Sequence, residues 1–328
     1  MCTRAVYIGL ENTVITSRSM DWSTDLNTNL WAFPRGMNRD GAAGPRSIRW
    51  TSKYGSVVSS AFESASVDGI NEMSLVVNLL YLAESEYVQP LPGDPRLPLS
   101  VAAWVQFVLD NYATVAEAVA AIRQEPFYVV PVPTPDGQPG SLHLSISDAT
   151  GDSAIFEYVG GKLVIHHGRQ YRVMTNSPIF EQQLALDAYW RQIGGLTMLP
   201  GTNRPADRYV RASFYINALA KTANNAEAIA GAFSVIRNAS VPLRISTPEQ
   251  PIIDETLWRT VFDHKNLRYY FDSARSPSIF WVDLAGIDFN LGSGVKKLTL
   301  TGGAIFNGSV AAQFQPAIPF NFIAATVN

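Results

Sequence analysis

The 328-residue sequence contains a single cysteine, Cys2, and no apolar run as long as the roughly 18 residues that suggest a membrane span. One cysteine cannot form an internal disulfide, so cysteine usage does not indicate a compartment. Blocks of basic or acidic residues are also missing, and the formal net charge is −3 at pH 7. These absences argue against a membrane span, a nucleic-acid partner and an electrostatic membrane anchor.

The four histidines form no recognisable metal site. His143, His166, His167 and His264 show neither the HExxH spacing nor a nearby cysteine partner. His166 and His167 close a predicted strand, where surface or supporting roles are common. We therefore expect neither a metal ion nor another cofactor. No secretory signal pattern is visible at the start, so the protein is cytoplasmic if Met1 is its native first residue, unless a leader has been removed.

The composition and the order of predicted elements indicate the fold class. Hydrophobic residues make up 47% of the chain and charged residues 16%, which is ample material for a large core. By length the chain could hold two domains, but one large domain also fits. Helices are predicted over residues 100–111, 114–124, 180–192, 205–220 and 226–236. Strands come before, between and after these helices, which favours a layered α+β architecture over a parallel βαβ one. Residues 36–46 read as a loop, and Gly69-Ile70-Asn71-Glu72 reads as a turn.

The cysteine follows the initiator methionine directly. Methionine aminopeptidases remove Met1 when the next side chain is small, and Cys2 qualifies. The processed chain would begin with a thiol and a free α-amine, which titrates near about 7.7–8.0. This amine can accept the thiol proton, directly or through one water, as in N-terminal-nucleophile hydrolases. The alternative is that the cysteine follows the initiator methionine by chance and has no catalytic role, which is common.

The residues after Cys2 predict a hairpin. Residues 5–10 and 14–17 have strand composition, and residues 11–13 form the expected turn. Pairing about that turn brings Cys2 opposite residues 18–21, to within about two residues of register. Arg18 near the thiol would favour the thiolate, and Asp21 would orient the amine. The alternative is that Arg18 and Asp21 form an ordinary surface ion pair without a catalytic role.

Several short strings along the chain carry a resemblance to a known family. They are Met1-Cys2-Thr3-Arg4, Ser17-Arg18-Ser19-Met20-Asp21-Trp22, Asp68-Gly69-Ile70-Asn71-Glu72, Thr175-Asn176-Ser177-Pro178, and Leu199-Pro200-Gly201 followed by Asp207-Arg208-Tyr209-Val210-Arg211. In this order they resemble the choloylglycine hydrolase family of N-terminal cysteine hydrolases, which contains conjugated bile salt hydrolases and penicillin V acylases. Further strings at 29–31, 51–57, 83–87 and 99–104 resemble the Gram-negative penicillin V acylases.

The resemblance implies a fold, an assembly and a location. The fold would be one N-terminal-nucleophile hydrolase domain over residues 1–328, a four-layer αββα sandwich with two antiparallel sheets. The Gram-negative branch implies a periplasmic location and a homotetramer. The segment between Asn176 and Arg208 is shorter than in bile salt hydrolases, where an insertion helps to assemble the tetramer. The mode of assembly therefore stays open.

The resemblance also assigns roles at matching positions. Cys2 would be the nucleophile with its own α-amine as general base, and Arg18 and Asp21 would flank the thiol and the amine. Asn176 matches the side-chain oxyanion donor. Arg208 matches the arginine that supports the pocket, and Arg211 would be structural.

Two aromatic residues would shape specificity. Tyr81 stands where bile salt hydrolases have asparagine and acylases have an aromatic residue, and its backbone N–H would be the second oxyanion donor. Trp22 and Tyr81 would line an acyl pocket, or else be ordinary core aromatics.

The implied activity is amide hydrolysis through a cysteine thioester, with penicillin V as the test substrate and N-acyl homoserine lactones as candidate natural ones. The alternatives are conjugated bile salt hydrolysis and a non-catalytic small-molecule binder on the same fold.

Overall fold

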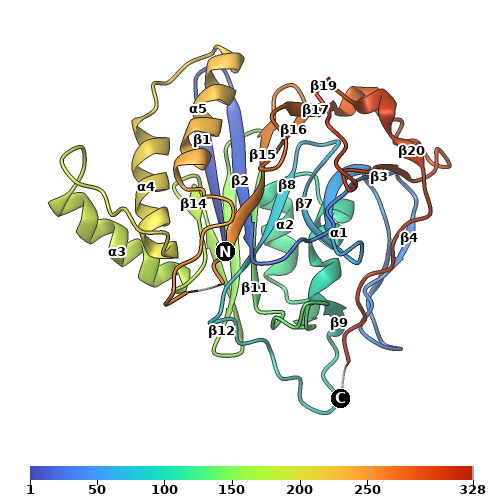
Figure 1. Ribbon diagram of the computed structural model, residues 1–328. Coiled ribbons are helices and arrows are strands. Elements are labelled where there is room, and N and C mark those ends of the chain that lie inside the picture. Colours follow the sequence, from blue (N-terminus) through green and yellow to red (C-terminus); the bar gives the residue numbers. More distant parts are fainter. Residues whose placement is uncertain (251, 327–328) are drawn as a thin grey trace.

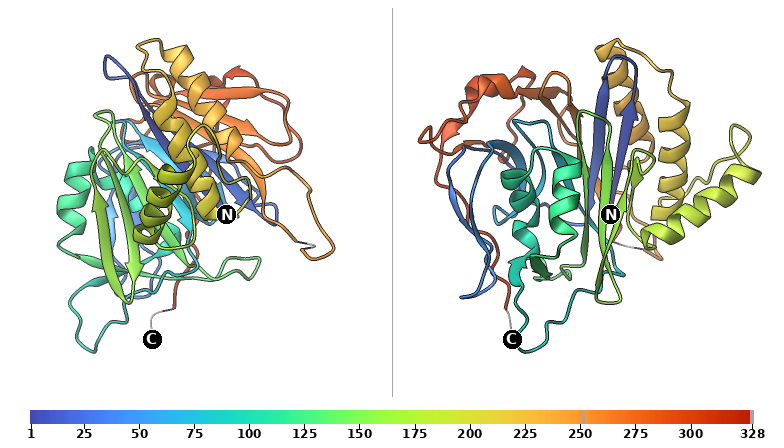
Figure 2. Two further views of the ribbon diagram at one scale, coloured as in Figure 1. Left: turned by 90° about the vertical axis from the view of Figure 1, so that its left-hand side faces the viewer. Right: turned by 180° about the vertical axis from the view of Figure 1, so that it is seen from behind.

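The computed structural model describes residues 1–250 and 252–326 and shows two large sheets packed face to face between two layers of helices (Figures 1 and 2). The first sheet has seven strands in the order β14 (Val173–Met174), β1 (Cys2–Ile8), β2 (Val14–Trp22), β15 (Glu255–Asp263), β16 (Arg268–Ser273), β17 (Ile279–Asp283) and β19 (Gly308–Ser309). The second has nine strands in the order β13 (Lys162–His167), β12 (Ser153–Val159), β11 (Leu142–Ser147), β8 (Val76–Tyr81), β7 (Ala65–Asn71), β6 (Ser56–Ala61), β3 (Leu30–Phe33), β18 (Lys296–Leu298) and β20 (Gln315–Pro316).

The helices form the two outer layers. They are α1 (Trp104–Asn111), α2 (Val115–Ile122), α3 (Phe180–Ile193), α4 (Pro205–Ala218) and α5 (Asn225–Asn238), with short 3₁₀ segments η1 (Val101–Ala103), η2 (Leu284–Gly286) and η3 (Ala311–Gln313). Helices α4 and α5 pack on β1 and β2, whereas α1 packs on β7 and β8 (Figure 2). Apart from the parallel β17–β19 pair, the strand pairs of both large sheets are antiparallel. The predicted α+β four-layer sandwich is confirmed.

The capping signal that the sequence shows at residue 114 begins helix α2 in the structure. Thr114 accepts a hydrogen bond from the backbone N–H of Glu117 and so caps α2. Helix α1 is buried along nearly its whole length. It packs on β7 and β8, and its Phe107 ring meets the ring of Phe127 in β10 (Phe127–Val130), which pairs with β9 (Leu97–Ser100) as a smaller sheet. Among the described residues, no helix is long and apolar enough to cross a bilayer.

The predicted turn at Gly69–Glu72 begins too early, because Gly69, Ile70 and Asn71 lie inside strand β7 and only Glu72 belongs to the turn. A Cβ atom at this glycine would lie 2.7 Å from Val58 Cγ1 and 2.8 Å from the carbonyl oxygen of Val57. The glycine therefore permits a close approach of neighbouring strands, which leaves the same sequence signal as a turn. The chain reverses over Asn71–Ser74, where the N–H of Ser74 donates to the carbonyl oxygen of Asn71 at 2.9 Å and Ser74 has a positive φ of 71°.

The predicted loop 36–46 also needs correction. It contains β4 (Asn38–Asp40), which pairs with β5 (Arg49–Thr51) as a separate two-stranded sheet. A strand of three residues is too short to show the alternation of apolar and polar residues from which strands are predicted.

Candidate active site

The β1–β2 hairpin sets the register that the sequence predicted. Cys2 pairs with Met20, and Arg4 pairs with Arg18. Side chains alternate between the two faces of a strand, so Cys2, Met20 and Arg18 share the face toward the second sheet. Consistent with this, Arg18 Nη2 donates to the carbonyl oxygen of Leu79 on β8 at 3.0 Å. The thiol and its neighbouring cation therefore lie between the two sheets.

The sulfur of Cys2 lies in a tight, buried environment. The residue is 2% exposed, and Arg18 Nη2 lies 3.3 Å from Sγ. Met20 Sδ lies 3.7 Å from the same sulfur and 3.4 Å from Arg18 Nη2. The guanidinium thus offers the sulfur both a hydrogen bond and a positive charge.

Arg18 is itself held by residues that the sequence analysis did not assign to the site. Its Nη1 lies 3.5 Å from Asp68 Oδ2, and its guanidinium carbon lies 4.7 Å from the ring centroid of Trp258. Asp68 also accepts hydrogen bonds from Asn78 Nδ2 and the Tyr269 hydroxyl, both at 2.7 Å. Burial raises the pKa of Asp68, while the charge of Arg18 and these hydrogen bonds oppose the rise.

The backbone of Cys2 is held from the other side. Its N–H donates to Asn176 Oδ1 at 2.7 Å, and its carbonyl oxygen accepts from Arg208 Nη1 at 2.6 Å. Arg208 Nη2 donates to the same Asn176 oxygen at 2.7 Å, and Asn176 Nδ2 donates to the carbonyl oxygen of Tyr81 at 2.6 Å. The amide of Asn176 therefore connects the first residues of β1 to α4 and β8.

Asp21 lies on the opposite face of β2 from the thiol, facing the helix layer. Its Oδ2 lies 3.5 Å from Arg208 Nη1, and its Oδ1 accepts from the Thr256 hydroxyl at 2.6 Å. Arg208 also donates to Thr3 Oγ1 at 2.6 Å. Burial lowers the pKa of Arg208, and the charge of Asp21 opposes this effect. The predicted partners thus separate: Arg18 contacts the sulfur, whereas Asp21 fixes Arg208.

Met1 extends the pairing of β1 by one residue. Its ammonium group donates to the carbonyl oxygen of Asp21 and pairs with Asp254 Oδ2, both at 2.6 Å. Its carbonyl oxygen accepts from the N–H of Asp21 at 2.8 Å. With Met1 in place, the nitrogen of Cys2 is a peptide nitrogen.

An apolar pocket of about 610 Å³, partly open to solvent, reaches the thiol. Cys2, Trp22 and Tyr81 all line it, and the rings of Trp22 and Tyr81 meet edge to face at 6.1 Å between centroids. Ile323 in the C-terminal segment also lines it, and its N–H bonds to the carbonyl oxygen of Ser64 at 2.9 Å. No motif marks Ile323, so the sequence could not place it here.

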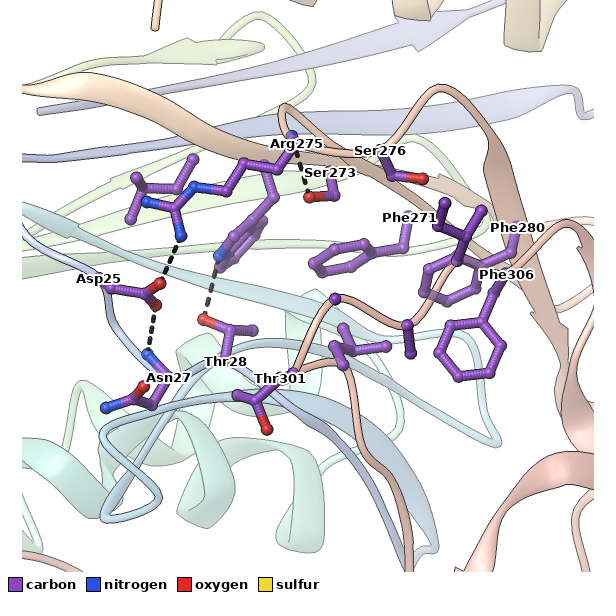
Figure 3. A pocket seen from close by; sticks show the side chains of 17 residues that line it. Asp25, Asn27, Thr28, Phe271, Ser273, Arg275, Ser276, Phe280, Thr301 and Phe306 are labelled. Carbon is purple, nitrogen blue, oxygen red and sulfur yellow. Dashed lines mark hydrogen bonds and ion pairs between the residues drawn. The ribbon is translucent and has the colours of Figure 1, made fainter. Parts of the chain in front are cut away.

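A second pocket is lined by residues of β15, β16 and β17 and by residues of the segments 25–28 and 300–306 (Figure 3). It encloses about 1080 Å³, part of it solvent, and Trp258, Phe271 and Phe280 line its apolar side. An ion pair between Asp25 and Arg275 closes one edge (Figure 3). None of the site residues predicted from the sequence lines this pocket.

The layered fold, with a thiol on the first strand between two sheets, defines an amide hydrolase of the N-terminal-nucleophile class. A family model described as linear amide C–N hydrolases, choloylglycine hydrolase family, matches residues 2–296. The chain belongs to this family. It is 52% identical to a penicillin V acylase of Pectobacterium atrosepticum, over 98% of this chain and 92% of the relative.

One solved structure agrees with this assignment, and a second shares the fold. The penicillin V acylase from Agrobacterium tumefaciens is 55% identical, covers 98% of this chain and all of its own, and gives a TM-score of 0.91. The C2A mutant of a conjugated bile acid hydrolase from Clostridium perfringens is 22% identical, with a TM-score of 0.78 over 93% of this chain and 98% of its own. The second likeness concerns the fold alone.

Proposed function

We propose that this amide hydrolase removes the acyl side chain of penicillin V-type amides, with the thiol of Cys2 as nucleophile after Met1 has been removed. The observation that carries the proposal is the position of the sulfur, which touches the Arg18 guanidinium at 3.3 Å and opens on an apolar pocket. The names of two relatives more than 50% identical, both penicillin V acylases, support the substrate class. By the resemblance we also expect a homotetramer in the periplasm.

The proposed reaction uses one residue as nucleophile and base. Once Met1 is gone, the nitrogen of Cys2 is an amine that can take the thiol proton, while Asn176 Oδ1, now 2.7 Å from this nitrogen, orients it. The sulfur attacks the acyl carbon, and the carbonyl oxygen becomes an oxyanion. Asn176 Nδ2 and the backbone N–H of Tyr81 donate to this oxyanion.

The tetrahedral intermediate then collapses with loss of the C–N bond. The protonated α-amine gives its proton to the leaving nitrogen, which departs as the free amine. The acyl group stays on Cys2 as a thioester. A water molecule gives a proton to the α-amine and attacks the thioester carbon. The C–S bond breaks, the carboxylic acid leaves, and the α-ammonium returns its proton to the sulfur, which restores the thiol.

The pocket supports specificity for the acyl group rather than for the amine. Burial of a phenyl ring against Trp22 and Tyr81 is worth roughly 1.5–3 kcal/mol. The aromatic residue at position 81 argues against a specialised bile salt site.

A panel of three substrates tests the proposal. The processed enzyme is mixed with penicillin V, glycocholate or a long-chain N-acyl homoserine lactone, and the released amine is measured. We expect the highest kcat/KM for penicillin V. A higher value for glycocholate would favour bile salt hydrolysis. No turnover of any of the three, with Cys2 first in the chain by intact mass, would favour a non-catalytic binder.

Replacement of Asn176 tests the oxyanion donor. We expect Asn176→Asp to lower kcat about 10²–10³-fold, because it keeps the acceptor for Arg208 and loses the donor Nδ2. Asn38→Ala, at an exposed position of β4, serves as control and should leave kcat unchanged. Near-normal kcat in Asn176→Asp, measured with penicillin V, would remove the side chain from the mechanism.

A further inference from the structure

Trp22, an aromatic residue that lines the acyl pocket, is hydrogen-bonded to a carboxylate in the loop between the small β9–β10 sheet and the second large sheet. Asp136 lies in the loop of residues 131–141, which connects β10 to β11. Its Oδ2 accepts hydrogen bonds from Trp22 Nε1 and from the Thr24 hydroxyl, both at 2.7 Å. Its Oδ1 accepts from the Thr134 hydroxyl. Two donors from the end of the β1–β2 hairpin and one donor from the loop itself therefore converge on the Asp136 carboxylate.

The loop presents this carboxylate on a tight turn. The N–H of Thr134 donates to the carbonyl oxygen of Gln138 at 2.9 Å, and the N–H of Gly137 donates to that of Thr134 at 2.8 Å. Gly137 has a φ of 85°, which glycine adopts without strain. Partial burial opposes ionisation of Asp136, but the hydrogen bonds from Thr134, Thr24 and Trp22 outweigh it and hold its pKa below the usual value. The acceptor is therefore a carboxylate at neutral pH, and its hydrogen bonds are charge-assisted.

Both partners of this contact face the acyl pocket. Trp22 lines it from β2, and Val132 and Thr134 line it from the loop. Trp22 is 8% exposed, and a buried indole N–H needs an acceptor. Without Asp136 the indole N–H would lose its acceptor, and the loop would lose this hydrogen bond to β2. The Asp136–Trp22 hydrogen bond thus fixes the position of the Trp22 ring relative to the 131–141 loop, and both line the same pocket.

We propose that Asp136 is a positioning residue, which fixes Trp22 and the 131–141 loop as a closed wall and so sets selectivity for acyl groups large enough to reach Trp22. This inference rests on the proposed function, in which the pocket receives the acyl group. Asp136 touches neither the sulfur nor the residues around it, and acts on the substrate only through Trp22 and the loop.

Kinetics of Asp136→Ala with two p-nitroanilides that differ only in the acyl group test this role. For the phenoxyacetyl substrate we expect KM to rise roughly tenfold with little change in kcat, as loss of a charge-assisted hydrogen bond implies. For the acetyl substrate we expect kcat/KM to stay within about twofold. Asp136→Asn should fall between, because its amide oxygen still accepts from Trp22. Asp94→Asn, a loop carboxylate bound to Arg96 outside the pocket, is the matched control.

A double-mutant cycle separates positioning from a general structural role. Trp22→Phe removes the N–H donor and keeps a ring, so Asp136→Ala should add less than about twofold in that background. Equal losses for both acyl groups, an unchanged KM or fully additive effects would overturn the inference. Thermal unfolding is recorded for each variant. If Asp136→Ala does not fold, the kinetics of the two substrates are compared between Asp136→Asn and the wild type instead. An inactive wild-type enzyme would refute the proposed function instead.

Discussion

Cys2→Ala is expected to lower kcat for penicillin V at least on the order of 10³-fold, because no other side chain near the pocket can form the thioester. The chain has no second cysteine, and the residues around Sγ are Arg18 and Met20. Neither of these is a nucleophile. The measurement is the rate of amine release by processed enzyme at saturating substrate.

The same variant should keep its fold, which makes the result interpretable. Arg18 retains Asp68, the carbonyl oxygen of Leu79 and the ring of Trp258 as partners when the sulfur is removed. Its thermal unfolding should therefore lie close to that of the wild type, and it should still bind phenoxyacetate. If Cys2→Ala retains hydrolysis of the best substrate, the assigned nucleophile is wrong.

An extra residue ahead of Cys2 is expected to abolish activity although the thiol remains. A peptide nitrogen has no basic lone pair, so the chain would lose its general base, which is typically worth 10²–10⁴-fold. Met1 also occupies the backbone N–H and carbonyl groups of Asp21, which the processed chain would leave free. We expect a loss on the order of 10³-fold or more from these effects together.

One preparation provides both arms of this experiment. The chain is made behind a leader that a protease removes just before Cys2, and activity is measured before and after cleavage. Intact mass identifies the first residue, and iodoacetamide titration reports whether the thiol is reactive in each form. Comparable turnover by the uncleaved chain would show that the free α-amine is not needed.

The sequence predicted the fold and most of the residues around the thiol for identifiable reasons. The hairpin of β1 and β2 is local, so alternation and a short turn fixed its register and brought Cys2 opposite Met20. Asn176 and Arg208 were found only through the resemblance, since nothing in their spacing shows that they meet at Cys2. Gly69 was misread because a glycine in a turn and a glycine at a close strand approach look alike in sequence.

Other contacts of the site were not predicted from the sequence, although Asp68 stands in one of the strings that carry the resemblance. Asp68 and Trp258 reach Arg18 from different strands, and Ile323 reaches the pocket from the far end of the chain. Asp136 meets Trp22 across 114 positions of sequence. Such contacts depend on the pairing of strands far apart in sequence, as for Trp258 on β15 beside β2, and on the packing of the two sheets, and a single sequence records neither.

By itself the sequence indicated the layered α+β class and the family, and it singled out Cys2 and a neighbouring arginine as candidates for the site. These follow from short-range features, namely a cysteine next to the start, strand alternation and motifs of a few residues. Only the tertiary structure decided that Arg18 faces the sulfur while Asp21 faces Arg208, and that Asp136 holds Trp22. The physical reason is that the two faces of one strand meet different layers, so neighbours in sequence acquire partners from opposite sides of the molecule.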